Sequence, residues 1–166
     1  MSLKKFVLSS VLLAVGLLLH QVSPNFVFGL RPDFLLIMMF ISLSFVEDFK
    51  YVFVIGLVSG VLTALTTTFP GGQLPNIIDK VITAPAVYML MRVFNTKLNG
   101  KIGTIIIGFL GTLISGTIFL LSALYLVGLP ASLGVLFPTV LVAAFLNSMC
   151  ISFITKILNV TLKYSN

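Results

Sequence analysis

The sequence predicts an all-α integral membrane protein, a bundle of six transmembrane helices. Hydrophobic residues make up 58% of the 166 residues and charged residues only 8%, and the mean hydropathy is +1.19. This composition excludes an ordinary soluble domain. The apolar runs are continuous rather than alternating, and lipid accepts only helices or closed barrels, so helices are expected. Residues 1–166 have room for one transmembrane domain in the lipid bilayer.

Each expected span is an apolar segment bounded by polar or helix-breaking residues. The first follows Lys4 and Lys5 and resembles a signal peptide, but five further apolar segments come after it, so we expect it to be retained. The second would be only ~20 Å long against a hydrocarbon core of ~30 Å, so either the helix is short or the preceding loop dips into the membrane. The six spans cover residues 6–22, 34–46, 51–66, 77–93, 102–127 and 133–158.

Small residues recur at helical spacing in several spans, which predicts close helix packing in lipid. In the first span Ser10 and Ala14 are four residues apart, which favours packing within the bundle, with docking to another membrane protein as the second interpretation. Pro85 and Pro138 are expected to kink the fourth and sixth spans. The other candidates for close packing are Gly56, Gly60, Ala64, Gly108, Gly111, Ser115 and Gly116.

The basic residues predict the orientation of the bundle. Six spans place both termini on one side, and of the 10 Lys and Arg residues only Arg31 and Lys80 fall on the other side. Cytoplasmic loops carry an excess of Lys and Arg, so both termini are expected in the cytoplasm of a cell-membrane protein. The polar segments 31–33 and 66–80 then face outside, together with His20.

The most polar stretch is residues 66–80, TTTFPGGQLPNIIDK. Two prolines and two adjacent glycines interrupt the helix, so polar groups gather where the third span ends and the fourth begins, as in a solute site. Glycine N–H groups and side-chain amides suit a carboxylate, nearby phenylalanines suit an aromatic ring, and helix capping is the alternative role of the threonines. The candidate binding residues here are Thr66, Thr67, Thr68, Phe69, Gly71, Gly72, Gln73, Asn76, Asp79 and Lys80.

Asp79 and Lys80 are adjacent, so on a helix their side chains diverge by ~100° and are not expected to pair well with each other. One interpretation pairs Asp79 with Arg31 and Lys80 with Asp33 to lock the outer loops. The other leaves one charge of each sign for a zwitterionic solute. Asn147, a lone amide in the sixth span, either faces the cavity or makes a hydrogen bond between helices.

Other chemistries are not supported by the residues present. One His and four scattered acidic residues do not make a metal or catalytic cluster, so we expect no enzyme and no cofactor. Residues 95–101 end like a phosphate loop, but the earlier glycine and the Ser or Thr after Lys101 are missing, so this chain alone should not bind ATP. The basic residues are spread over span ends, which argues against nucleic acid.

Three segments resemble the TrpP-type tryptophan transporter family: residues 29–33 (GLRPD), residues 66–80, and the first-span run 13–16 (LAVG) that leads to His20. The resemblance spans most of the chain. It implies a substrate-binding S-component of an energy-coupling factor (ECF) transporter, with six helices and an outward-facing site for L-tryptophan. It also implies partners, namely a coupling membrane subunit and two ATPase subunits, with Ser10 and Ala14 as the nearest match to the docking pattern of the first helix.

For tryptophan, the resemblance implies that Arg31 or Lys80 meets the carboxylate and that Asp33 or Asp79 meets the ammonium. Threonine hydroxyls and glycine N–H groups in 66–80 would bind the remaining polar atoms, and phenylalanines the indole. Residues 30–33, followed by an apolar helix, also resemble MreD, a membrane scaffold protein of cell-shape assembly. Because that family does not call for residues 66–80, transport is favoured. A stand-alone secondary transporter is the third alternative.

Overall fold

Six helices make up the structure, a computed structural model that describes residues 2–23, 32–94, 98 and 100–164, without the side chains of 159–164. Within these ranges there is no β-strand, so the predicted all-α class is confirmed. Each helix coincides with one predicted span, apart from a few residues at its ends. The helices are α1 (Leu3–Val22), α2 (Phe34–Ser44), α3 (Phe49–Thr66), α4 (Gln73–Val93), α5 (Lys101–Leu126) and α6 (Leu133–Tyr164).

Four of these helices, α1, α3, α5 and α6, are long and apolar enough to cross a membrane. α2 has 11 residues and is therefore only ~16 Å long, as its short apolar segment indicates. α4 has 21 residues but carries Asp79 and Lys80 on its buried side, which makes it less apolar. The described helices therefore fit a multi-pass membrane protein.

The break between α3 and α4 lies at residues 67–72, where the prolines and glycines predict it. α4 begins at Gln73, earlier than the predicted start near Ile77. The reason is that Pro75 lies in the first helical turn, where a missing N–H group leaves no helical hydrogen bond unmade. Pro85 and Pro138 lie inside α4 and α6, and both helices continue past them.

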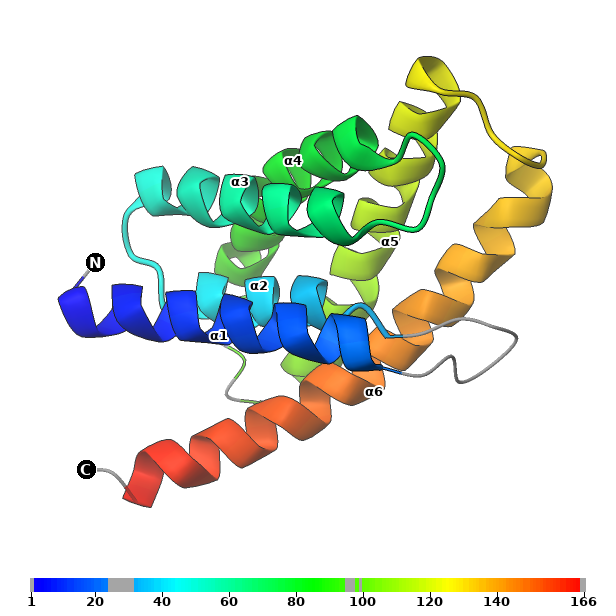
Figure 1. The fold of residues 1–166 in the computed structure, drawn as a ribbon. Coiled ribbons are helices and arrows are strands. Elements are labelled where there is room, and N and C mark those ends of the chain that lie inside the picture. The colour runs from blue at the N-terminus through cyan, green and yellow to red at the C-terminus, as the bar shows by residue number, and fades with distance from the viewer. Residues whose placement is uncertain (1, 24–31, 95–97, 99, 165–166) are drawn as a thin grey trace.

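α2 is the central helix of the bundle. All of its residues from Leu35 to Leu43 are buried, and it contacts each of the five other helices. In Figure 1 it lies behind α1, with α3 and α4 above it. A helix that is apolar on every side is typical of the interior of a bundle, and α2 supplies much of the core, with Phe40 as its largest fully buried side chain.

Close helix packing at small residues, as the sequence predicts, holds α4 against α3 and α6 against α5. A Cβ atom on Gly56 would lie 2.9 Å from the carbonyl oxygen of Lys80, and one on Gly60 would lie 3.0 Å from the Cα of Ile77. Likewise, a Cβ atom on Gly108 would lie 3.0 Å from the Cα of Ser148. These close approaches are possible only without side chains, and the contact at Gly56 fixes the part of α4 that carries the charged residues.

Polar contacts tie α1, the turn between α2 and α3, and α4 together at the end of the bundle where α1 begins and α6 ends (Figure 1). The Lys5 ammonium donates a hydrogen bond to Glu47, and this contact lowers the pKa of the Glu47 carboxyl. The Tyr88 hydroxyl donates to the Glu47 carbonyl oxygen at 3.3 Å and accepts from the Arg92 guanidinium at 2.5 Å. The placement of this end in the cytoplasm stays a prediction from the distribution of basic residues.

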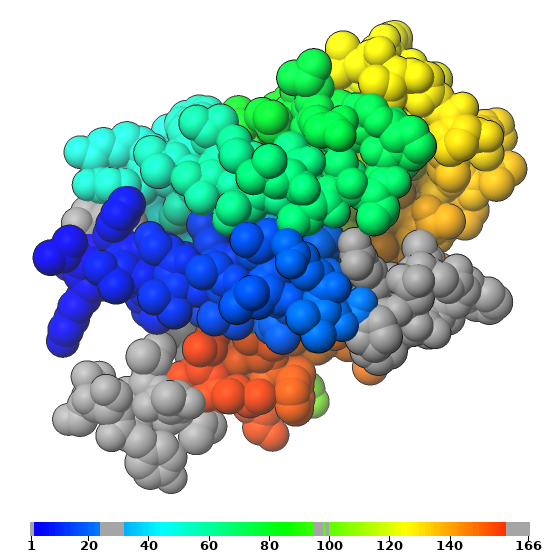
Figure 2. Space-filling model, in the orientation of Figure 1, coloured from blue at the N-terminus to red at the C-terminus, as the bar shows by residue number. Residues whose placement is uncertain are grey.

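Ser10 and Ala14 face away from the bundle, and both are exposed. α1 instead turns Leu13 and Gly16 inward, and a Cβ atom on Gly16 would lie 2.9 Å from the Met38 side chain. The interpretation that the Ser10–Ala14 pair packs within the bundle is therefore wrong, because a different face of α1, the one that carries Leu13 and Gly16, points inward. The pair borders an apolar groove of about 210 Å³ between α1 and α3, on the face seen in Figure 2.

The packing at Gly56 predicts that Gly56→Ala destabilises the protein by about 1–3 kcal/mol, because the added methyl group meets the backbone of α4. The measurement is the midpoint of thermal unfolding of the purified protein in detergent. Gly134→Ala is the matched control, because a Cβ atom there meets nothing within 4 Å, and its midpoint should stay unchanged or rise slightly. Equal midpoints for the two variants would contradict the packing argument.

Candidate functional site

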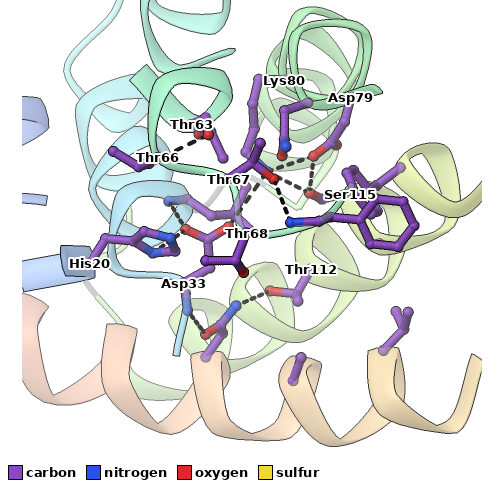
Figure 3. Close-up of a pocket in the computed structure, with 18 of the residues that line it drawn as sticks. His20, Asp33, Thr63, Thr66, Thr67, Thr68, Asp79, Lys80, Thr112 and Ser115 are labelled. Atoms are coloured by element: carbon purple, nitrogen blue, oxygen red, sulfur yellow. Dashed lines mark hydrogen bonds and ion pairs between the residues drawn. The ribbon is translucent and has the colours of Figure 1, made fainter. Parts of the chain in front are cut away.

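A cavity of about 290 Å³ lies at the end of the bundle where α3 meets α4. All six helices contribute to its wall, so the site exists only in the assembled bundle (Figure 3). Its volume is close to the lower end of ~300–1,000 Å³ that is usual for small-molecule sites. The cavity is lined by His20, Asp33, Leu36, Thr63, Thr66, Thr67, Thr68, Phe69, Asn76, Asp79, Lys80, Thr112, Ser115, Gly116, Phe119, Thr139, Val140, Ala143 and Asn147.

Asp79 and Lys80 form the most deeply buried part of the wall. The Lys80 ammonium donates to Asp79 Oδ2 at 2.6 Å and to the Ser115 hydroxyl at 3.1 Å. Ser115 donates to the same Asp79 oxygen at 2.8 Å, and the Thr83 hydroxyl donates to Asp79 Oδ1, also at 2.8 Å. Both side chains are almost inaccessible, at 2% and 3% exposure. The carboxylate and the ammonium are therefore buried and bonded to protein groups, although both residues line the cavity.

The expectation that Asp79 and Lys80 do not pair with each other is thus wrong. Their Cβ atoms diverge around the helix, but the long methylene chain of Lys80 bends back to reach the neighbouring carboxylate. Burial favours this geometry, because an unpaired charge in a low-dielectric interior is strongly unfavourable. Ser115, on α5, connects to both groups. The rule that adjacent residues on a helix do not face each other therefore does not decide the pairing of these two buried charges.

Asp33 is the more open carboxylate of the site. It caps α2 by accepting the Leu36 N–H at 3.0 Å. His20 Nδ1 lies 3.4 Å from Asp33 Oδ1, and the Lys80 ammonium lies 3.5 Å from Asp33 Oδ2. The pairing of Lys80 with Asp33 is one of the two interpretations that the sequence allows. Figure 3 shows His20 and Asp33 pointing toward one another. The Asp33 side chain is 25% exposed, so this carboxylate, unlike that of Asp79, is open to a solute.

Asn147 joins three helices at the wall of the cavity. Its side-chain oxygen accepts the Asp33 N–H at 2.9 Å, and its amide nitrogen donates to the Thr112 hydroxyl at 3.3 Å. Both interpretations from the sequence therefore apply, because the same amide lines the cavity and makes hydrogen bonds between helices. Its effect is to fix the start of α2, and with it the position of the Asp33 carboxylate.

The loop between α3 and α4 supplies neutral polar groups and an aromatic ring. The Thr66 hydroxyl donates back to the Leu62 carbonyl oxygen at 3.0 Å, as a threonine at a helix end often does. The Thr67 hydroxyl accepts the Phe69 N–H at 3.3 Å. The Phe69 ring packs edge-to-face on Phe119, with ring centroids 5.3 Å apart. The loop is therefore held by contacts within it and with α5, and its threonines line the cavity.

The structure brings most of the predicted site residues together at this cavity, but not all of them. Gly71, Gly72 and Gln73 do not line it. Gly71 has φ +70°, which turns the chain, and the Gly72 N–H donates to the Phe69 carbonyl oxygen at 2.9 Å rather than facing a solute. Arg31 lies outside the described residues, as do Phe26 and Phe28. The predicted residues on the cavity wall are Asp33, Thr66, Thr67, Thr68, Phe69, Asn76, Asp79, Lys80 and Asn147.

Sequence reasoning missed the contribution of α5. It assigned Ser115 to close packing, whereas Ser115 bonds to Asp79 and Lys80. Thr112, Ser115 and Phe119 all line the cavity, and their spacing of three and four residues puts them on one face of the helix. That spacing was the available signal. It was hidden because most residues around these positions on α5 are apolar, so the polar positions do not stand out in the linear sequence.

The site is suited to holding a small solute. Its charged groups pair with one another, and hydroxyl and amide groups surround them. Two aromatic rings, those of Phe69 and Phe119, also meet at the wall. Such a combination of a few placed polar groups with apolar surface is typical of a ligand pocket. A molecule that carries an ammonium group and an aromatic ring matches the Asp33 carboxylate and the Phe69–Phe119 pair.

Comparison with known proteins gives one family for nearly the whole chain. The model of the family "Tryptophan transporter TrpP" matches residues 2–163. A "probable tryptophan transport protein" of Clostridium acetobutylicum is 50% identical over 87% of this chain and 84% of the relative. A protein with the same description in Bacillus subtilis is 39% identical over 100% of this chain and 96% of the relative. Another, in Clostridium perfringens, is 41% identical over 84% of this chain and 81% of the relative. No solved structure matches significantly.

The enclosed ion pair predicts that Asp79→Ala destabilises the protein by about 3–5 kcal/mol, because it leaves the buried Lys80 ammonium poorly compensated. The double variant Asp79→Ala/Lys80→Met should lose less than the sum of the two single variants, because it removes both charges. Thermal unfolding in detergent measures both effects. Glu47→Gln, which breaks the exposed pair with Lys5, is the control and should change the midpoint little. Strictly additive losses would contradict the coupling.

Proposed function

Because the chain belongs to the family of the tryptophan transporter TrpP, we propose that it is the membrane-embedded substrate-binding subunit, an S-component, of an ECF transporter that takes up L-tryptophan. In this proposal it works with a coupling membrane subunit and two ATPase subunits, which supply the energy from ATP. The chain itself performs the capture step. It lies in the cell membrane with its cavity open to the outside.

The observation that carries the proposal is a cavity whose wall contains both a partly open carboxylate and an aromatic pair. Asp33 is 25% exposed, with His20 Nδ1 3.4 Å from one carboxylate oxygen and the Lys80 ammonium 3.5 Å from the other. These neighbours favour the ionised carboxylate. We assign the ammonium group of tryptophan to Asp33. Asp79, at 2% exposure, is assigned the supporting role of holding Lys80 in place.

For the substrate carboxylate, the proposal uses the threonine hydroxyls of the α3–α4 loop together with Lys80. Thr66, Thr67 and Thr68 line the cavity, and Thr68 is exposed. Arg31, two residues before Asp33 in the sequence, is a further candidate for this carboxylate. The hydroxyl groups orient the ligand, and the cationic groups balance its charge.

Transport is favoured over the MreD-like scaffold role, because a scaffold does not need a ligand-sized cavity with buried charged groups at its wall. A stand-alone secondary transporter would use the same cavity but would take up tryptophan without partner subunits. Uptake driven by an ion gradient in liposomes that contain this chain alone would favour that alternative.

The proposal predicts that Asp33→Asn weakens tryptophan binding by about 30-fold or more, because it removes the charge that meets the ammonium group. Asparagine also caps helices well, so α2 should keep its start. Equilibrium binding of radiolabelled tryptophan to the purified protein measures the effect.

Glu47→Gln is the matched control for this experiment, because it makes the same change of acid to amide just beyond the other end of α2, away from the cavity. It should bind tryptophan like the wild type. Wild-type affinity in Asp33→Asn would exclude Asp33 as the ammonium partner, and no binding by the wild type would contradict the proposed function.

The outer face of α1 is the proposed docking surface for the coupling subunit. Ser10 and Ala14 are exposed there, with the apolar groove between α1 and α3 beside them. Small side chains let a partner helix approach closely in lipid. The serine keeps its hydroxyl occupied by donating to the Phe6 carbonyl oxygen at 3.1 Å, so it presents a largely apolar surface to a partner.

We expect Ser10→Leu and Ala14→Leu to reduce co-purification with the coupling subunit and to leave tryptophan binding unchanged, because the bulky side chains keep a partner helix away. Val135→Phe adds bulk to an exposed position of α6, where Val135 is 63% exposed, and serves as the control. If the leucine variants co-purify as well as the control, the coupling subunit does not dock on this face of α1.

A further inference from the structure

We propose that Phe119, with Phe69 as its edge-to-face partner, is the aromatic wall that receives the indole ring and selects aromatic amino acids over aliphatic ones. The substrate then lies with its charged end deep in the cavity, at Asp33, and its ring near the mouth. This inference rests on the proposed function and adds the residues that determine specificity and the direction in which the ligand lies.

The order of residues along α5 gives this direction. Thr112 and Ser115 come first, and both bond to the polar network through Asn147 and Asp79. Phe119 follows one turn later, ~6 Å further along the helix. The lining of the cavity on α5 thus changes from hydroxyl to aromatic within two turns.

The second helix of the wall, α6, shows the same change from exposed to buried residues along the cavity. α6 runs in the opposite direction to α5 and lines the cavity with Thr139, Ala143 and Asn147. Thr139 is exposed, whereas Asn147 is buried and holds the Asp33 N–H. The side chains that bond to the charged residues, Ser115 to Asp79 and Asn147 to Asp33, therefore lie at the buried ends of the lining on α5 and α6. Phe119 follows Ser115 toward the less buried part of α5. A zwitterion with an aromatic side chain fits this arrangement in one direction only.

The two rings are held in place from separate parts of the chain. Their planes meet at 85° with centroids 5.3 Å apart, and such an edge-to-face pair can accept a third aromatic ring. Phe119 is on regular helix, whereas Phe69 is in the α3–α4 loop. That loop is held against the end of α5, because a Cβ atom on Gly71 would lie 2.8 Å from the Val127 side chain. Among the described residues of the wall, these are the two phenylalanines.

The chain contains no tryptophan, so the fluorescence of bound L-tryptophan can be measured without interference from protein indole. The test compares the wild type, Phe119→Leu, Phe119→Tyr and Phe109→Leu. Phe109→Leu is the matched control, because it makes the same change on the same helix at a residue that does not line the cavity. The readouts are the affinity for tryptophan and the emission wavelength of the bound ligand.

Phe119→Leu should weaken tryptophan binding by roughly 2- to 10-fold, the scale of one aromatic pair, and should change the emission of the bound indole. It should also reduce the preference for tryptophan over leucine in competition. Phe119→Tyr, which keeps the ring, should stay close to the wild type, as should Phe109→Leu.

Two results would overturn the assignment while leaving the proposed function intact. One is unchanged affinity, emission and preference in Phe119→Leu. The other is an equal loss in Phe109→Leu, which would show that the change acts through helix packing. If the wild type does not bind tryptophan at all, the proposed function and this inference both fail.

Discussion

Charged groups inside a membrane protein must be compensated by other protein groups, and the rest of this structure depends on that constraint. Asp79 and Lys80 are 2% and 3% exposed, so neither can rely on water. Their partners come from α5 through Ser115 and from the start of α2 through Asp33. The network can form only when these helices are assembled, so folding of the bundle and construction of the cavity are the same event.

Small residues bring the helices close enough for this network to form. Gly56 lets α3 touch the backbone of α4 at Lys80, and Gly108 lets α6 touch α5. Between these pairs lies α2, which is apolar on all sides and fills the centre of the bundle. Asp33 is the N-cap of this helix. The polar groups at the wall are thus placed by apolar packing that itself touches no solute.

The sequence was enough to predict six helices, the break at residues 67–72 and most of the polar residues at the cavity, because hydropathy, proline and glycine act locally. The Asp79–Lys80 pair could not be predicted, since burial and the position of Ser115 on another helix decide it. The outward direction of Ser10 and Ala14 also depends on the neighbouring helices, because a small-residue pair suits an inner or an outer face equally. Phe119 is part of a cavity face that apolar neighbours conceal in the linear sequence.

The contacts of Asp33 have a consequence for the selectivity of the proposed binding of an ammonium group. This carboxylate already accepts the Leu36 N–H and has His20 and Lys80 as neighbours, so an arriving cation exchanges interactions instead of simply adding one. The net gain is then a small difference between two well-satisfied states. A neutral molecule of similar shape would disturb these contacts without forming a new ion pair with the carboxylate. Discrimination against such neutral analogues can therefore exceed what the gain in affinity alone suggests.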